Sequence, residues 1–472
     1  MAKSTELLAL DVAALAPKLR AREISPVELT EAYLGRIGEL DGKLRAYITV
    51  TAEVARAAAK AAETEIMAGK WRGPFHGVPV AIKDLFYTSG IRTTGGSKIL
   101  AEFVPDYDAT SWKRLADAGA VLLGKLNLHE FAYGLTSANP HWGAVRNPYD
   151  LDRIPGGSSG GSAAAIVAGM AAATIGTDTG GSIRIPAALC GCVGFKPTWS
   201  RVSRYGVIPL ANTLDHVGPI TRTVRDAAMM LGVIAGHDAN DSTSSRNPVP
   251  DYTKPLGAAI RGTRVGVIRE LRSGLGTDFS RSFDAALKQL ASLGAEVEEV
   301  SVPSIEMAAM AVTIIMFAEG LEYHENWIRT RPNDYGDDVR QLLEMGMGVT
   351  GTSYVRMQRA RARILADALN ALEGRDVLVA PTSSVPAPRL DQIGMGDGDS
   401  DRIDLVQAIF RFTGPFDATG QPALAIPIGL SSGGLPLSMQ IIGRPFDEAA
   451  VIKVADAYER ARGALPAPKL GL

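Results

Sequence analysis

The chain alternates between two patterns of apolar and polar residues, and the first is helical. Between positions 29 and 40, apolar side chains recur every three or four residues, which is the spacing of one face of an α-helix. Ser25 and Pro26 precede this stretch and are suited to the cap and the first helical position. An alanine-rich stretch predicts a second helix over 51–68. We therefore expect residues 1–70 to form a helical cover rather than the functional site.

The second pattern is an alternation of short apolar runs with amphipathic helices. Apolar runs bounded by turn residues occupy positions 78–83, 120–125, 263–271, 295–302 and 376–382. Helical spacing occurs near 109–118 and over 279–293. Two further apolar runs flank Ser-Ser-Gly-Gly at 431–434, which predicts a hairpin. The predicted fold is therefore α/β, with a large mixed, mostly parallel twisted sheet sandwiched between helices.

Composition and charge narrow the class of protein. Of the 472 residues, 46% are hydrophobic and 21% are charged, which is typical of a globular protein. Lys and Arg total 49 against 51 for Asp and Glu, so we expect no nucleic-acid partner. No apolar stretch reaches the roughly 18 to 20 residues of a spanning helix, and the N-terminus lacks the pattern of a signal peptide. These features predict a cytoplasmic protein that does not bind membranes.

The two cysteines, Cys190 and Cys192, do not indicate a metal centre. They are too few for a zinc site and too close in sequence for an ordinary disulfide. We interpret them as small buried hydrophobic residues. We expect the protein to use neither a metal nor a cofactor.

A glycine-rich stretch offers a candidate nucleophile, Ser182, with no histidine close in sequence to take its proton. The upstream Gly-Gly-Ser-Ser-Gly at 156–160 matches the nucleophile elbow of α/β-hydrolases, but the segment before it contains prolines and predicts a loop, not the required strand. The same cluster lacks the Lys-Ser/Thr pair of a phosphate-binding loop. His216, next to Asp215, is interpreted as a loop histidine without a catalytic role.

A lysine is the alternative base. Lys83 ends an apolar run, where a charged side chain must either emerge at the edge of the sheet or lose its charge on burial. With an ordinary pKa near 10.4, roughly one lysine in 2,500 is neutral at pH 7, which costs a base about 4.6 kcal/mol. Burial and hydroxyl partners must offset much of that cost if Lys83 is to act on a serine.

Three motifs in order carry a resemblance to a known family. They are Gly-Val-Pro-Val-Ala-Ile-Lys-Asp at 77–84, Pro-Gly-Gly-Ser-Ser-Gly-Gly-Ser-Ala-Ala-Ala at 155–165 and Gly-Thr-Asp-Thr-Gly-Gly-Ser-Ile-Arg-Ile-Pro at 176–186. The combination resembles the amidase signature family of amidohydrolases, and the resemblance runs over most of the chain. It implies a single amidase domain over 1–472, with a catalytic core at 75–225 and a variable pocket wall at 300–410.

The resemblance implies a serine hydrolase that works without histidine. Lys83 matches the catalytic lysine of the family, Ser158 its bridging serine, usually held on a cis peptide, and Ser182 its nucleophile. The oxyanion would be met by the backbone N–H groups of Thr179, Gly180, Gly181 and Ser182. Asp178 and Arg184 bracket this turn, and we expect them to support it through an ion pair or backbone hydrogen bonds.

The family contains stand-alone hydrolases and also the A subunit of tRNA-dependent amidotransferases, which uses ammonia released from glutamine inside a multi-subunit complex. In the amidotransferase branch, the residue after Ser-Ile-Arg is commonly a glutamine that helps to hold the substrate, whereas this chain has Ile185. Ile185, with Trp142 as a second candidate pocket residue, favours an apolar substrate.

We therefore expect a stand-alone amidase, a monomer or homodimer. Its substrate would be a small-molecule aliphatic, aryl or anilide amide, with carbamates, urethanes and esters as further candidates. The amidotransferase branch is the alternative. A binding module without activity is disfavoured, because Lys83, Ser158 and Ser182 occupy all three catalytic positions.

Overall fold

The computed structural model describes residues 2–393 and 403–470. Its described strands form one sheet of eleven and a separate pair, β4 (Ala138–Asn139) and β5 (Gly143–Ala144). In spatial order, the large sheet comprises β1 (Tyr47–Val50), β3 (Val121–Leu126), β2 (Pro79–Lys83), β6 (Ala173–Asp178), β8 (His216–Thr221), β7 (Val193–Lys196), β12 (Ala423–Leu430), β13 (Pro436–Ile442), β11 (Val377–Pro381), β9 (Arg264–Ile268) and β10 (Glu296–Val300).

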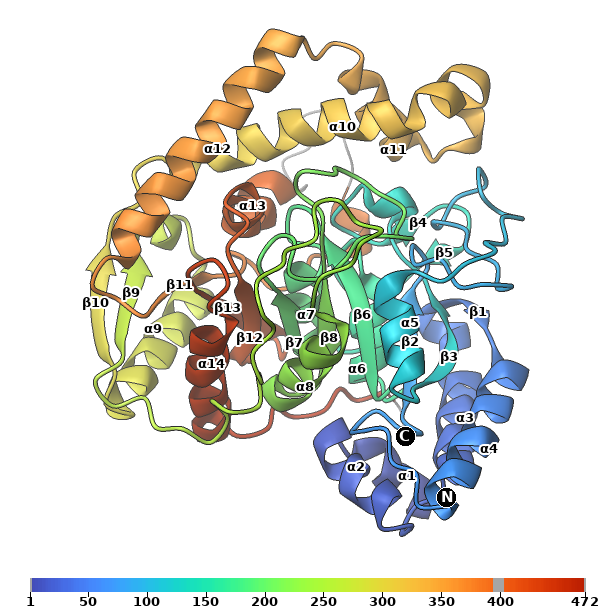
Figure 1. Cartoon of the computed structure of the whole chain (residues 1–472). Coiled ribbons are helices and arrows are strands. Elements are labelled where there is room, and N and C mark those ends of the chain that lie inside the picture. Colours follow the sequence, from blue (N-terminus) through green and yellow to red (C-terminus); the bar gives the residue numbers. More distant parts are fainter. Residues whose placement is uncertain (1, 394–402, 471–472) are drawn as a thin grey trace.

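Helices surround this sheet (Figure 1). They are α1 (Ala2–Ala9), α2 (Val12–Arg20), α3 (Pro26–Leu44), α4 (Ala52–Met67), α5 (Thr110–Asp117), α6 (Gly160–Val167), α7 (Arg184–Cys190), α8 (Val224–Ile234), α9 (Thr277–Ser292), α10 (Ala308–Thr330), α11 (Asp337–Gly346), α12 (Gly351–Leu372), α13 (Arg411–Ala418) and α14 (Glu448–Arg462). The N-terminal helices lie at one end of the sheet, near β1 and β3, whereas α10 and α11 lie above the sheet and α12 descends toward β9 and β10. None of the described helices is long and apolar enough to span a membrane.

The prediction of a large mixed sheet covered by helices is confirmed, although its parallel share is smaller than expected. Of the ten neighbouring strand pairs, only β3–β2, β2–β6, β11–β9 and β9–β10 are parallel. The sequence pattern did not identify the short strand β7 or the proline-containing β8, and both run antiparallel to their neighbours in the middle of the sheet.

The central parallel strands explain where a site can form. β2 lies between β3 and β6, and the register places Val80 beside Ala173 and Ile82 beside Ile175. The carboxyl ends of parallel strands meet at one edge of a sheet, so Lys83 at the end of β2 comes beside the end of β6. Ligands of open α/β sheets bind at such edges.

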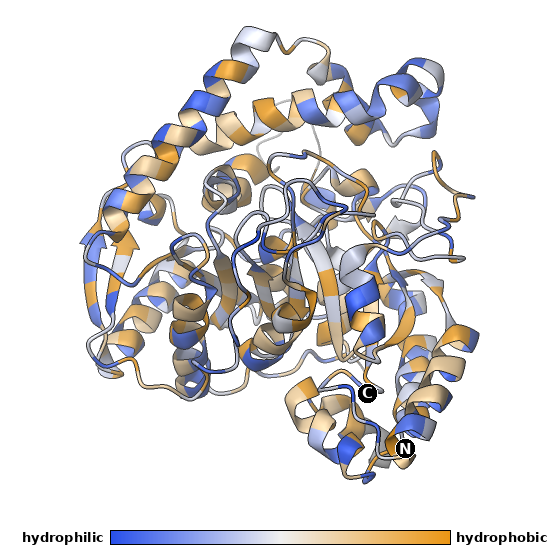
Figure 2. Ribbon diagram, in the orientation of Figure 1, coloured by the Kyte–Doolittle hydropathy of each residue, from blue (hydrophilic) through white to orange (hydrophobic). Residues whose placement is uncertain are grey.

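Apolar packing holds these elements together. The main core is continuous from the N-terminal helices, through the central strands, to α14. The outer helix α12 shows hydrophilic and hydrophobic residues in alternation along its length (Figure 2). This pattern is expected where only one face of a helix rests on the body of a protein.

Candidate active site

Lys83 lies at the centre of the site. Its Nζ donates hydrogen bonds to Ser158 Oγ at 2.7 Å and to Thr177 Oγ1 at 2.8 Å. The side chain is completely buried. The three residues come from the end of β2, the loop before α6 and strand β6, so the sheet edge brings together residues that are far apart in sequence.

The environment of Lys83 makes it a weak base instead of a permanent cation. Burial lowers the pKa of Lys83 to about 7, although the carboxylates of Asp178 and Asp215 act in the opposite direction. A far larger fraction of this lysine than of an ordinary one is then neutral at pH 7. The cost of about 4.6 kcal/mol for an ordinary lysine base is therefore mostly removed.

Several hydrogen bonds hold the loop that carries Ser158 in place. The Gly157–Ser158 peptide is cis, the conformation that the family resemblance implies. The Ser158 carbonyl accepts hydrogen bonds from the His129 amide at 3.1 Å and from Ser137 Oγ at 3.2 Å. The amide of Ser159 donates to the carbonyl of Ser182 at 3.2 Å, which joins this loop to the turn that carries the candidate nucleophile.

The turn at 179–182 is organised by the carboxylate of Asp178. This carboxylate accepts hydrogen bonds from the amides of Gly181 at 2.6 Å, Ile183 at 3.1 Å and Arg184 at 3.3 Å. The Gly181 amide is thus already bonded, so it is not free to meet an oxyanion as the sequence analysis expected. The amides of Thr179, Gly180 and Ser182 donate to no described residue, and these three remain candidate donors.

Asp178 and Arg184 form the ion pair that the sequence analysis anticipated. The distances from Asp178 are 3.0 Å to Arg184 Nε and 3.1 Å to Nη2, with both side chains completely buried. Burial by itself would raise the pKa of Asp178, but the guanidinium of Arg184 holds it below its ordinary value. The guanidinium also donates to Asp417 Oδ2 at 2.6 Å and to Gln440 Oε1 at 2.9 Å.

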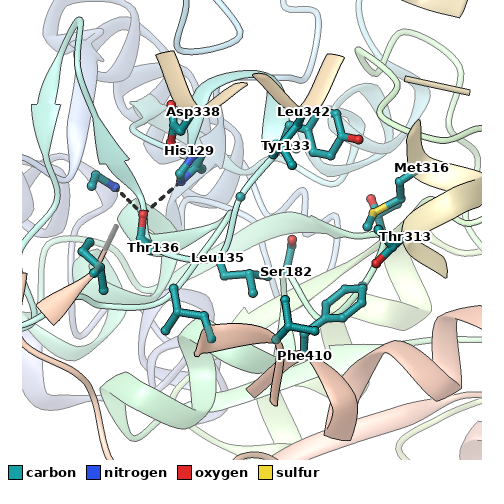
Figure 3. A pocket seen from close by; sticks show the side chains of 18 of the residues that line it. His129, Tyr133, Leu135, Thr136, Ser182, Thr313, Met316, Asp338, Leu342 and Phe410 are labelled. Carbon is teal, nitrogen blue, oxygen red and sulfur yellow. Dashed lines mark hydrogen bonds and ion pairs between the residues drawn. The ribbon is translucent and has the colours of Figure 1, made fainter. Parts of the chain in front are cut away.

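Ser182 faces a cavity of about 860 Å³ (Figure 3). Its walls come from the segment 129–138, from the turn at 179–182, from α10 and α11, and from residues flanking the segment 394–402. Part of the predicted pocket wall at 300–410 therefore lies outside the described residues. The described lining is mostly apolar, and its polar members include Thr136, His129 and Asp338. His129 Nε2 lies 2.9 Å from Asp338 Oδ2, which connects α11 to the loop around Ser158.

The two residues expected to shape substrate preference do not line this cavity. Ile185 is completely buried, in a cluster with Ile154 and Leu189. A Cβ added to Gly181 would lie 2.6 Å from Ile185 Cδ1, so Ile185 packs behind the turn. The ring of Trp142 lies under the guanidinium of Arg92, at 5.1 Å. Ile185 therefore supports the turn and gives no direct information about the substrate.

His216 is the first residue of β8, not a loop residue, and it does not pair with its neighbour Asp215. Successive side chains of a strand point to opposite faces, so Asp215 accepts a hydrogen bond from Thr179 Oγ1 at 2.6 Å while His216 Nδ1 lies 3.2 Å from the carbonyl of Asp178. Burial lowers the pKa of His216 well below its ordinary value. A neutral histidine bonded to a backbone carbonyl is a structural group here. Cys190 and Cys192 are buried and free, as interpreted.

Sequence reasoning missed several residues that shape the site. Thr177, the second partner of Lys83, precedes Asp178 in the same motif and could have been found from the alternation of side chains along a strand. Asp417 and Thr413 belong to a helix more than 220 positions downstream and carry no local signal. Only the fold brings them to the turn.

The arrangement can support acyl transfer. It combines a buried, partly neutral amine, a hydroxyl bonded to that amine, and a second serine on a turn with unpaired amides beside a cavity.

Comparison with known proteins agrees with this chemistry. The model of the Amidase family matches residues 28–452. The A subunit of the glutamyl-tRNA(Gln) amidotransferase from Geobacter metallireducens is 44% identical, over 97% of this chain and 98% of its own. The structure of the corresponding protein from Thermotoga maritima is 35% identical, covers 99% of each chain and has a TM-score of 0.83. A chain solved in "an unexpected vestigial protein complex", described as revealing the origins of an s-triazine catabolic enzyme, is 34% identical over 95% of this chain and 98% of its own, with a TM-score of 0.90.

These relatives correct two expectations. The stand-alone amidase acting on small amides, carbamates or esters is contradicted, because proteins 41–44% identical over nearly the whole chain are named as subunits of an amidotransferase. The expected monomer or homodimer without a nucleic-acid partner is contradicted by the same names. The physical reason for the error is that the substrate class was argued from Ile185, which is buried and does not line the cavity. On the family model, the matched length and the shared fold, the chain belongs to the amidase signature family.

Proposed function

We propose that this chain is the amide-hydrolysing A subunit of a tRNA-dependent amidotransferase and that it releases ammonia from glutamine. The observation that carries the proposal is 41–44% identity, over 95–97% of the chain, to proteins named as the A subunit of glutamyl-tRNA(Gln) amidotransferase. The match extends beyond the three motifs to nearly the full length of both proteins.

In this proposal Ser182 is the nucleophile. Its Oγ attacks the side-chain amide carbon of glutamine, while its proton passes through the Ser158 hydroxyl to neutral Lys83. The C–N bond then breaks, a proton returns through Ser158 to the leaving nitrogen, and ammonia departs. Water attacks the resulting acyl-enzyme with the same proton relay, and glutamate is released. The contact of 2.7 Å between Lys83 Nζ and Ser158 Oγ supports this role for the lysine.

The negative oxygen of the tetrahedral intermediate needs hydrogen-bond donors. The amides of Gly180 and Ser182, and that of Thr179, have no described partner and lie in the turn beside the cavity. Removing one such donor from a serine hydrolase typically costs about 100- to 1,000-fold in kcat. Asp178 and Arg184 keep the turn in place, because the Asp178 carboxylate accepts hydrogen bonds from the amide of Gly181 in the turn and from those of Ile183 and Arg184 just after it.

A direct test measures ammonia release from glutamine in three preparations. They are the chain alone, the chain with the companion subunits of its organism, and the complex with glutamyl-tRNA(Gln). We expect the complex to release ammonia and to amidate the tRNA, and the Ser182→Ala variant to lose both activities. The proposal fails if the assembled wild-type complex releases no ammonia from glutamine, or if Ser182→Ala retains wild-type rates.

A further inference from the structure

Helix α13 packs directly against the turn that carries Ser182. Phe410 immediately precedes α13, and Thr413 and Asp417 lie within it, so the three residues are spaced for one helix face. Thr413 Oγ1 donates a hydrogen bond to the Gly180 carbonyl at 2.6 Å. Asp417 Oδ2 accepts one from Arg184 Nη2 at 2.6 Å. The helix therefore contacts both the turn and Arg184, the first residue of α7.

The two glycines of the turn make this close approach possible. A Cβ added to Gly180 would lie 2.3 Å from Cε2 of Phe410, whose ring also lines the cavity in Figure 3. A Cβ added to Gly181, where φ is +131°, would lie 2.2 Å from Thr413 Oγ1. Neither space is available to a side chain. The backbone of the turn is thus in direct contact with the side chains of the helix.

The peptide unit between Gly180 and Gly181 is held at both of its polar groups. Thr413 binds its carbonyl oxygen, and the carboxylate of Asp178 binds its N–H at 2.6 Å. Fixing one peptide plane limits the rotation of the planes on either side of it. Those neighbouring planes carry the amides of Gly180 and Ser182, two of the free candidate donors.

Asp417 acts on the same turn through Arg184. The Arg184 guanidinium is completely buried and is shared between Asp178, Asp417 and the side-chain oxygen of Gln440. Loss of Asp417 would leave the Nη2 group with Asp178 alone. A buried guanidinium that loses one of its acceptors is expected to shift, and Asp178 would shift with it.

We propose that Thr413 and Asp417 are positioning residues for amide hydrolysis at Ser182. Thr413 acts through the Gly180 carbonyl, and Asp417 acts through Arg184 and Asp178, so that the free amides of the turn meet the oxyanion. This inference rests on the proposed function, because it takes Ser182 as the nucleophile and the turn as the oxyanion site.

The test uses a reagent that does not depend on glutamine. A fluorophosphonate reacts with an activated serine: the Ser182 Oγ–P bond forms, the P–F bond breaks, fluoride leaves, and the serine proton goes to the base. Its phosphoryl oxygen needs the same donors as an oxyanion. We would measure the second-order labelling rate of Ser182, and kcat and KM for ammonia release by the assembled complex.

The variants form matched sets. Thr413→Val removes the hydroxyl with little change in volume, and Thr413→Ser restores it. Asp417→Asn keeps one oxygen acceptor and replaces the other carboxyl oxygen with an amide nitrogen. Asp226→Asn is the control, because Asp226 is also a buried acid, but its carboxylate accepts hydrogen bonds from the backbone amides of Val12 and Ala13 at the start of α2.

We expect Thr413→Val and Asp417→Asn to lower both the labelling rate and kcat by about tenfold to a hundredfold. KM should change by less than about threefold, since binding of the substrate's ground state does not use these groups. Thr413→Ser should recover the wild-type labelling rate, and Asp226→Asn should lower the melting temperature without slowing labelling.

Folded Thr413→Val and Asp417→Asn proteins that label Ser182 at the wild-type rate would overturn the inference. If Asp417→Asn does not fold, the comparison of Thr413→Val with Thr413→Ser still decides it, and equal rates for that pair would overturn the role of Thr413. If the wild type is labelled at Ser182 but releases no ammonia from glutamine, the proposed function fails while the labelling comparison retains its meaning.

Discussion

At the scale of single residues, three buried lysines of the described chain have different hydrogen-bond partners. Lys125 Nζ lies 3.0 Å from the carboxylate of Asp84 and donates to Thr93 Oγ1 and to a backbone carbonyl, and Lys196 donates to backbone carbonyls. Lys83 alone bonds only to side-chain hydroxyls. A hydroxyl group can both donate and accept a hydrogen bond, whereas a carbonyl oxygen can only accept one. The partners of Lys83, more than its burial, suit it to a proton relay.

The pH dependence of catalysis should report Lys83. Its pKa is lowered to about 7 by burial, and the proposed mechanism requires the neutral amine. We expect kcat/KM for ammonia release to rise with pH, with an apparent pKa of about 7, and to level off above about pH 8. Rates between pH 5.5 and 9 would measure this limb. If kcat/KM instead rises with an apparent pKa near 10, then Lys83 either has the pKa of an ordinary lysine or is not the base.

The same lowered pKa has a consequence for stability. The unfolded chain holds a proton on Lys83 up to about pH 10.5, while the folded chain loses it near pH 7. Between these values the unfolded state binds more protons, so wild-type stability gains up to about 1.4 kcal/mol per pH unit from this residue. Lys83→Met lacks this gain, and its stability relative to wild type should therefore fall as pH rises from 7 to 10.

Thermal or denaturant unfolding at several pH values would measure that trend. Lys288→Met is the control, because Lys288 lies on the exposed side of α9 and should give a difference from wild type that does not change over the same range. A constant difference between Lys83→Met and wild type would contradict the lowered pKa.

At the scale of elements, periodicity located the helices and strands whose side chains alternate cleanly. The predicted helices over 51–68 and 279–293 correspond to α4 and α9, and the predicted hairpin is the antiparallel pair β12–β13. The strand β6 was missed because its first residues continue an alanine-rich stretch, so that residues 163–176 form one apolar segment in the sequence. Gly169, with φ of +72°, ends the helix there and lets the chain turn into β6.

The start of α3 offers a prediction for a helix cap away from the site. Ser25 Oγ accepts hydrogen bonds from the amides of Val27 at 3.0 Å and Glu28 at 3.3 Å. Ser25→Ala should lower the free energy of unfolding by about 1 kcal/mol, while the labelling rate of Ser182 stays at the wild-type value. Unfolding curves and labelling assays would check this, and Ser25→Thr, which keeps both the capping oxygen and the hydroxyl that donates to Glu63 Oε1 at 2.5 Å, should lose less stability. A slower labelling rate in Ser25→Ala would mean that the N-terminal helices influence the site.

At the scale of the whole molecule, the sequence identified the family but not the assembly. Three short motifs carried the resemblance, because the proposed chemistry requires a lysine and two serines in fixed local settings. The substrate class was argued from Ile185, whose side chain the fold buries behind the turn. The cavity is built instead from segments far apart in the chain, such as α10, α11 and the segment 129–138, so no local pattern describes it.

The proposed assembly gives the last prediction, which concerns stability instead of catalysis. A partner that binds only the folded chain stabilises it by RT ln(1 + [L]/Kd), about 2.7 kcal/mol at a free concentration 100 times Kd. The companion subunits should therefore raise the melting temperature of this chain in a concentration-dependent way and elute with it on size exclusion. Ser182→Ala should show the same shift, because association does not require the nucleophile, and this variant separates assembly from turnover. If saturating companion subunits neither shift the melting temperature nor co-elute, the chain does not belong to that complex, even if it hydrolyses glutamine alone.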